Sequence, residues 1–261
     1  MTDKIITEQT GDIARIIFNQ PEKRNAVSLE MWEAVEAAMT KFAADDSVRI
    51  LILSGAGGKA FVSGADISKF ETERASKEAV AHYNATTKRV YDMVEAFPKP
   101  TIAQIDGFCV GGGVALSLCC DLRICGENSA FAIPAAKLGL GYGFPGINRL
   151  VAVVGPSFAK EIFFTARRFD AEEARIMGLV NRVVPADKVA ETADETAKMI
   201  AANAPMTVNS VKFIVGQTVL PESERDLAAC DAKVKECFDS QDYIEGRKAF
   251  MEKRKPNFVG A

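Results

Sequence analysis

Two glycine-bearing stretches of this chain have the residue types needed to present backbone amides to a ligand. Residues 107–113 leave a predicted strand and enter an apolar helix, so the first amides of that helix lack helical partners. Such amides, aided by the positive end of the helix dipole, can bind an oxygen on which negative charge develops. Residues 60–67 also form a turn before a predicted helix. Either stretch alone fits a tight turn that needs small residues, but together they could supply two amides.

A third glycine stretch, residues 141–146, matches the GxGxxG pattern of dinucleotide-binding sites. That pattern binds a pyrophosphate only where a strand precedes it and a helix opens directly beneath it. Residues 136–140 are not strand-like, and Pro145 interrupts the stretch. The sequence therefore does not predict a dinucleotide site here.

The composition is that of an ordinary globular protein with no charge excess. Hydrophobic residues make up 48% of the 261 residues and charged residues 26%. The 32 basic and 35 acidic side chains give a formal charge of -3, so overall charge does not favour a nucleic-acid partner. Any contact with phosphate must be local. No apolar segment has the length of a signal peptide core or membrane span, so we expect a cytoplasmic protein with no membrane partner.

The cysteine and histidine residues do not predict a metal site. The six cysteines include no CxxC pair, and His82 is the only histidine. Four of the cysteines lie in apolar runs, where a small hydrophobic residue would serve equally well. We interpret the cysteines as reduced and structural.

The order of predicted elements indicates an α/β fold followed by a helical region. Strands alternate with helices up to Val184, which favours parallel pairing of the strands. Beyond Val184 the pattern predicts only helices, so we divide the chain into a core, residues 1–186, and a helical region, residues 187–261. The predicted core elements are a hairpin over residues 5–8 and 14–18, strands over 50–53, 101–105 and 122–125, and helices over 28–42, 76–96 and 114–120.

The chain resembles the crotonase family, also called the enoyl-CoA hydratase/isomerase family, over nearly its whole length. The resemblance implies an α/β spiral of ββα units with a carboxy-terminal helical trimerisation region, assembled as a homotrimer or a dimer of trimers. It rests on several motifs in order: residues 19–26 (NQPEKRNA), 61–67, 105–107 with the glycines 111–113, 120–121, 174–184 and 250–256.

The same resemblance implies an acyl-coenzyme A substrate and places residues along it. The thioester carbonyl is expected between the amides of Ala65 and Gly112, where charge collects during the reaction. Coenzyme A is then part of the substrate, and no tightly bound cofactor is expected. Without the resemblance, Lys23 and Arg24 would be interpreted as solvated charges and Phe250 as a core contact. The residues matching the family's coenzyme A contacts are Lys23, Arg24, Ala26, Ser63, Ala65, Asp66, Ile67 and, near the carboxyl terminus and often reaching a neighbouring subunit, Phe250 and Lys253.

The sequence departs from the family pattern at the acid and base positions. The two glutamates of the hydratases correspond to Ala115 and Ala135, and a further acid of some isomerases falls near Gly143. Alanine cannot take up or release a proton, so another group must perform this work in a hydratase. The remaining candidates are Tyr142 and, in the helix region that borders the acyl pocket in the family, His82 and Tyr83. The ordinary pKa of histidine, near 6.5, suits proton transfer, whereas Asp66 better suits a helix cap.

Two classes of function remain open at this point. The leading one is a crotonase-type enzyme, classed with the enoyl-CoA hydratases, that acts on an acyl-CoA through an oxyanion hole. Its reaction could instead be isomerisation, decarboxylation or thioester hydrolysis, all of which use the same amides. The second class is a non-catalytic acyl-CoA binder, which needs Ala65 and Gly112 but no acid.

Overall fold

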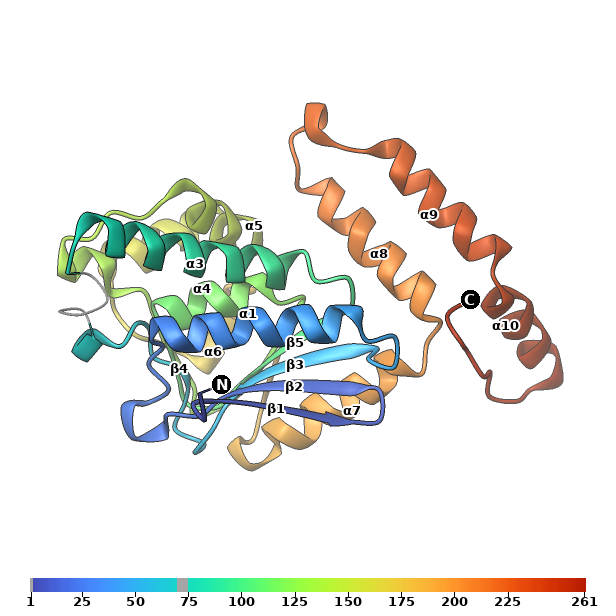
Figure 1. Ribbon diagram of the computed structural model, residues 1–261, viewed down its shortest axis with the longest axis horizontal. Helices are drawn as coiled ribbons and strands as arrows, with labels where there is room; N and C mark the ends of the chain where they lie inside the picture. The colour runs from blue at the N-terminus through green and yellow to red at the C-terminus, as the bar shows by residue number, and fades with distance from the viewer. Residues whose placement is uncertain (1, 70–74) are drawn as a thin grey trace.

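A six-stranded sheet forms the larger of two sheets in the computed structural model, which describes residues 2–69 and 75–261 (Figure 1). Its first two strands, β1 and β2, are antiparallel, which confirms the predicted hairpin, and the remaining neighbours are parallel. Strand β5 has the predicted bounds, and β3 and β7 extend slightly beyond them. In spatial order the strands are β1 (Ile5–Thr10), β2 (Ile13–Phe18), β3 (Ile50–Gly55), β5 (Thr101–Ile105), β7 (Leu122–Gly126) and β10 (Arg182–Val184).

A second sheet of four short strands was not apparent from the sequence. Each strand has only two or three residues, too few for an alternating pattern to be recognised. In each of the successive pairs β3/β4, β5/β6 and β7/β8, the first strand belongs to the larger sheet and the second to the smaller one. Each pair is followed by a helix, which confirms the predicted spiral of ββα units. The strands are β4 (Ala60–Val62), β6 (Phe108–Val110), β8 (Ala130–Ala132) and β9 (Phe169–Asp170).

The core helices follow the predicted order. Ser76 caps α3 by accepting a hydrogen bond from Ala79 N at 3.1 Å. The helix predicted from Val114 begins two residues earlier, at Gly112, because Gly111 takes a backbone conformation with φ of 55° and starts the turn. The helices of this part are α1 (Leu29–Ala44), α3 (Lys77–Glu95), α4 (Gly112–Cys119), α5 (Phe144–Thr165) and α6 (Ala171–Ile176), with short 3-10 helices at Pro21–Lys23, Ile67–Lys69 and Pro134–Leu138.

Both faces of the larger sheet are covered by helices. Leu51 and Leu53 of β3 belong to the main core with Trp32 of α1, whereas Ile50 and Ile52 belong to a second core with α7 (Val189–Ala201). Successive side chains of a strand point to opposite faces, so α1 and α7 lie on opposite sides of the sheet, as Figure 1 shows. Helix α7, which follows the predicted boundary at residue 187, is therefore packed on the sheet.

The last three helices lie apart from the sheets (Figure 1). They are α8 (Pro205–Thr218), α9 (Leu227–Asp239) and α10 (Gln241–Glu252). A 3-10 helix at Ala186–Lys188 precedes α7, and another at Glu222–Glu224 lies between α8 and α9. A groove of about 840 Å³ lies between them, lined in part by the exposed side chains of Val211, Phe238, Phe250 and Met251. Lys212 of α8 donates to Lys99 O at 2.9 Å and to Asp121 Oδ2 at 2.8 Å, which attaches this region to the core.

The cysteines are free thiols, and those of the apolar runs are buried as expected. Burial raises the pKa of Cys120 and of Cys125 to about 12, so these thiols stay protonated at neutral pH. Across residues 2–69 and 75–261, no helix combines the length and apolar character needed to cross a bilayer.

Candidate functional site

Gly64 and Gly112 bring the two predicted amide loops together. A Cβ atom on Gly64 would lie 3.9 Å from Gly112 N and 3.5 Å from Val110 O, and one on Gly112 would lie 3.7 Å from Gly64 Cα. Gly64 also has a φ of 106°, which a residue with a side chain rarely adopts. The glycines therefore permit a close backbone approach between the end of β4 and the start of α4.

The amides of Ala65 and Gly112 are both free to donate. Val27 N donates to Gly64 O at 2.8 Å, and Asp66 N donates to Val27 O at 3.0 Å, so the intervening amide of Ala65 points away from Val27. Gly112 is the first residue of α4, where an amide has no helical acceptor. Within the part of the chain that the structure describes, neither amide donates a hydrogen bond.

Asn25 anchors the loop that carries the predicted coenzyme A contacts Lys23, Arg24 and Ala26. Its fully buried side chain accepts from Gln20 N at 2.9 Å and donates to Ala56 O at 3.0 Å and Ala60 O at 2.7 Å. Arg24 and Asn25 are both left-handed, with φ of 53° and 55°. Asparagine adopts this conformation more readily than most residues. Asn25 lies within the motif at residues 19–26, but its residue type alone gives no sign of this anchoring role.

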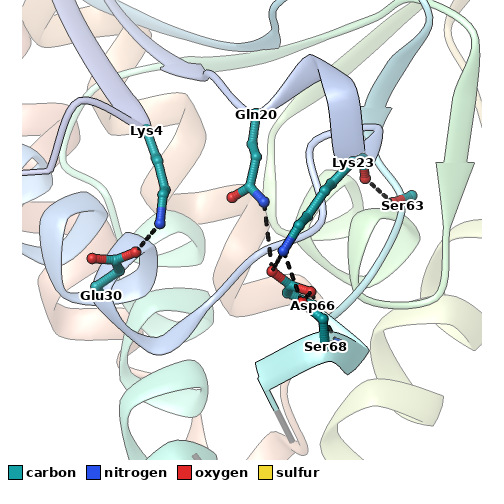
Figure 2. Close-up of polar contacts among 7 residues, drawn as sticks. All are labelled: Lys4, Gln20, Lys23, Glu30, Ser63, Asp66 and Ser68. Atoms are coloured by element: carbon teal, nitrogen blue, oxygen red, sulfur yellow. Dashed lines mark hydrogen bonds and ion pairs between the residues drawn. The ribbon is translucent and has the colours of Figure 1, made fainter.

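Lys23 and Asp66 form an ion pair across the site, as Figure 2 shows. Lys23 Nζ lies 2.8 Å from Asp66 Oδ2 and donates to Ser68 Oγ at 2.7 Å. Asp66 Oδ1 accepts from Ser68 N at 3.1 Å, so this carboxylate caps the 3-10 helix Ile67–Lys69. Burial alone would raise the pKa of Asp66, but the hydrogen bonds from Lys23 and Ser68 lower it. Asp66 therefore serves to fix Lys23 and this turn.

The other predicted coenzyme A contacts of the core surround the same loop. The guanidinium carbon of Arg24 lies 4.7 Å from the ring centroid of Phe108, and Arg24 forms no ion pair with any described residue. Ser63 Oγ donates to the backbone oxygen of Lys23 at 3.3 Å (Figure 2). Ala26 N donates to the same oxygen at 3.1 Å. The side chain of Ile67 lies outside the described residues.

A cavity of about 460 Å³ opens beside the start of α4. Helix α3 forms one wall, Ala115 and Leu118 of α4 form another, and the loop before α5 closes a third. Among the described residues, no aspartate or glutamate lines this cavity. Its polar lining consists of Tyr83, Asn84, Thr87, Lys88, Tyr91, Tyr142 and Arg149.

Tyr91 connects this cavity to Gly112. Its hydroxyl donates to Gly112 O at 3.3 Å and would lie 3.2 Å from a Cβ atom on Gly112. The ring packs edge-on against Trp32, with centroids 5.5 Å apart and an interplanar angle of 83°. Burial raises the pKa of Tyr91 well above its ordinary value, so the hydroxyl keeps its proton. Tyr91 could not be singled out from the sequence, because a tyrosine within a helical pattern carries no local sign of function.

The structure separates the acid and base candidates. Ala115 lines the cavity, whereas Ala135 is buried in the 3-10 helix Pro134–Leu138 and does not line it. Tyr142 lines the cavity, packs against Phe163 at 4.8 Å between centroids, and has its pKa raised by burial. Gly143 also lines the cavity and precedes α5. The segment before Gly141 is a 3-10 helix rather than a strand, in agreement with our rejection of a dinucleotide site.

His82 lies on the outer side of α3, away from the cavity lining. Its Nε2 is 3.5 Å from Glu33 Oε1 of α1, and its side chain is 56% exposed. Neighbouring positions of a helix point in different directions, so Tyr83 and Asn84 line the cavity while His82 does not. The structure therefore gives His82 a surface contact outside the cavity lining.

Phe250 and Lys253 lie at the end of the helical region. Phe250 is 83% exposed and lines the groove between α8, α9 and α10. Lys253 follows α10 with a left-handed φ of 53°. Both residues belong to a region that lies apart from the amide loops in this chain (Figure 1). Their predicted contact with coenzyme A from a neighbouring subunit stays a prediction.

Comparison with known proteins agrees with this architecture. A model of the family described as "Enoyl-CoA hydratase/isomerase" matches residues 8–261. The crotonyl-CoA hydratase of Syntrophomonas wolfei is 35% identical over 257 residues, which cover 98% of each chain. The solved structure of an enoyl-CoA hydratase/carnithine racemase from Magnetospirillum magneticum is similar, with a TM-score of 0.91 and 38% identity over 100% of this chain and 97% of that one. An enoyl-CoA hydratase structure from Bacillus anthracis has a TM-score of 0.90 and 34% identity, covering 99% and 100% of the two chains. This chain belongs to the enoyl-CoA hydratase/isomerase family.

Proposed function

We propose that this chain is an enzyme that binds an acyl-CoA thioester with its carbonyl oxygen between the amides of Ala65 and Gly112. The observation that carries the proposal is the approach of Gly64 to Gly112, which places two free amides on adjoining loops. Two such donors stabilise the negative oxygen formed when a proton is lost next to the thioester or a nucleophile adds to its conjugated double bond. Coenzyme A is part of the substrate here, and no separate cofactor takes part.

Enoyl-CoA hydration is the first reaction to test, because similar proteins from Syntrophomonas wolfei and Clostridium acetobutylicum are named as hydratases. Hydration needs a base for water and an acid for the adjacent carbon. At the positions that correspond to the two glutamates of the family's hydratases, this chain has Ala115 and Ala135. Tyr142 is the candidate that remains in the cavity. We therefore expect hydration at a rate far below that of an enzyme with two glutamates.

Decarboxylation of a malonyl-type thioester is the second candidate, favoured by a cavity lining without carboxylates among the described residues. In this reaction the bond between the α-carbon and the carboxylate breaks, and carbon dioxide leaves. The bonding electron pair passes into an enolate, whose oxygen the two amides stabilise. A proton then adds to the α-carbon. No general base is required, so alanine at positions 115 and 135 is compatible with this chemistry.

The substitution Gly112→Pro tests the proposal directly. Proline is tolerated at the first position of a helix, so the change removes one amide N–H while leaving α4 able to form. Loss of one such donor lowers kcat by about 10²–10³-fold. Crotonyl-CoA and malonyl-CoA are incubated separately with the wild-type protein and the variant, and the CoA esters are separated by chromatography.

Retention of the melting temperature shows that the Gly112→Pro protein is folded. Binding of free coenzyme A, measured by calorimetry, should be equal in the two proteins, since free coenzyme A has no thioester oxygen. Equal turnover by wild type and a folded variant would refute the assigned role of Gly112. Binding of acyl-CoA esters without turnover of any would instead favour a non-catalytic binder.

We further propose that the chain assembles as a homotrimer or a dimer of trimers through its carboxy-terminal helices. The apolar groove between α8, α9 and α10 supports this, because exposed side chains such as Phe238, Phe250 and Met251 gain stability when buried. In such an assembly Phe250 and Lys253 would reach the coenzyme A of a neighbouring subunit.

A further inference from the structure

The cavity beside α4 is lined by several hydrogen-bond donors. Lys88 and Arg149 line it, and lysine and arginine side chains can only donate. Lys88 Nζ already donates to Asp92 Oδ2 at 2.5 Å, so Arg149 is the cation of interest. Tyr91 and Tyr142 also line it, and burial raises the pKa of both, so they carry hydroxyl protons at neutral pH. No carboxylate of a described residue lines this space. A ligand with acceptor oxygens would therefore meet donors here and no opposing carboxylate.

Arg149 is held in place by carboxylates that lie outside the cavity lining. Its Nε donates to Glu95 at 2.8 Å, and its Nη2 donates to Asp92 at 2.8 Å and to Glu95 at 2.6 Å. Burial opposes the charge, but these hydrogen bonds raise the pKa of Arg149. Its Nη1 donates to no described residue, and its side chain is only 13% exposed. The guanidinium group is thus fixed, charged and able to make further hydrogen bonds.

Tyr91 is a second fixed donor, closer to the proposed thioester. Its ring packs on Trp32, which itself is buried in the core. The hydrogen bond from its hydroxyl to Gly112 O is long, at 3.3 Å. A carboxylate oxygen is a stronger acceptor than a backbone carbonyl, so it could take this proton in place of Gly112 O. The donor would then face an acyl group whose thioester is bound at the amide of the same glycine.

We infer that this cavity selects acyl-CoA esters whose acyl group ends in a carboxylate, and that Tyr91 and Arg149 are the specificity-determining donors. The inference rests on the proposed function, since the amides of Ala65 and Gly112 position the thioester. It extends that function by naming the substrate class as short dicarboxylic acyl-CoA esters. An acyl group that ends in a methyl group would form no hydrogen bond with either donor, so Tyr91 and Arg149 would keep only their partners in the protein.

The test compares succinyl-CoA with butyryl-CoA, whose acyl chains have equal length but end in a carboxylate and a methyl group. Dissociation constants are measured by titration calorimetry at one salt concentration. Consumption of each ester is followed by chromatographic separation of the CoA esters and free coenzyme A. We expect succinyl-CoA to bind about tenfold more tightly, or to be consumed preferentially, because a hydrogen bond to a charged group stabilises a complex by about that factor. Equal affinity and equal consumption of the two esters would overturn the inference.

Tyr91→Phe removes one hydroxyl and keeps the ring that packs on Trp32, so the variant should fold. We expect it to weaken succinyl-CoA binding by about tenfold and leave butyryl-CoA binding unchanged. Arg149→Lys, which keeps the charge but loses the fork of donors, should act in the same direction. Thr40→Val, at an exposed position of α1 outside both the cavity and the carboxy-terminal groove, removes a hydroxyl as a control and should leave the binding of both esters unchanged.

The possible failures can be distinguished. If neither ester binds, nor free coenzyme A, the proposed function itself fails. If both esters bind well but Tyr91→Phe weakens them equally, Tyr91 does not select the carboxylate and the inference is wrong while the proposed function stands.

Discussion

Lys23 Nζ and Asp66 Oδ2 lie 2.8 Å apart and join the loop before α1 to the turn that carries Ala65. The carboxylate is only 5% exposed, whereas the lysine side chain is 40% exposed. One member of the pair is therefore fixed inside the protein, and the other extends from it toward solvent. Lys23 is thus placed to affect ligand binding, and Asp66 to affect the stability of the fold.

Arg24 should contribute more than Lys23 to coenzyme A binding. Asp66 offsets the charge of Lys23, whereas Arg24 has no ion-pair partner among the described residues. We expect Arg24→Gln to raise the Kd for coenzyme A about fivefold and Lys23→Gln to raise it about twofold, with both losses smaller at high salt. Calorimetric titration measures this, with Lys198→Gln on α7 as the control. A larger loss for Lys23→Gln would contradict the assignment.

Asp66 should make stability depend on pH in the acidic range. Its pKa is lowered in the folded state, so its stabilising effect is complete above the unfolded pKa of about 3.9 and is lost as the pH falls through the folded pKa. Asp66→Asn should lower the free energy of unfolding by about 1–3 kcal/mol at neutral pH. The difference in free energy of unfolding between variant and wild type, measured by urea unfolding, should become smaller as the pH is lowered toward about pH 3. A difference that stays constant with pH would exclude the ion pair as its source.

Gly113→Ala should strongly destabilise the protein. A Cβ atom at this position would lie 2.0 Å from Val62 O and 2.9 Å from Val62 C, so α4 and β4 would have to separate. We expect a loss of about 3 kcal/mol or more in the free energy of unfolding, measured with urea. Gly216→Ala is the matched control, because a Cβ atom there would meet no heavy atom within 4 Å and alanine favours the helix α8. If both variants lost a similar amount of free energy of unfolding, the contact with Val62 would not be the cause of the destabilisation.

The carboxy-terminal groove should bury its apolar side chains in an assembly. Phe250→Asp places a charge on a side chain that is 83% exposed in the single chain, so a monomer should tolerate it. In a trimer the same charge would be buried and would drive dissociation. Light scattering after size exclusion should give a trimer or hexamer for the wild type and a smaller species for the variant. Met199→Asp, on the exposed side of α7, should leave the mass unchanged. A monomeric wild type would contradict the prediction.

Elements with a strong local pattern could be predicted closely from the sequence. The strand Thr101–Ile105 has its predicted bounds, and α3 begins after the cap residue Ser76. Both signals are local, since a cap residue and a short run of β-branched residues act on their own neighbours. The glycine-bearing stretches 60–67 and 107–113 could likewise be recognised from the sequence, and the family resemblance assigned Ala65 and Gly112 within them.

The tertiary structure alone decided which side chains surround those glycines. Tyr91 reaches Gly112 across 21 residues of sequence, and Lys23 reaches Asp66 across 43. The two- and three-residue strands of the second sheet likewise depend on their partners for stability. The sequence thus determined the local elements and the family of the site, because those depend on near neighbours. The cavity and its donors depend on contacts between distant segments, which leave no period or spacing in the chain itself.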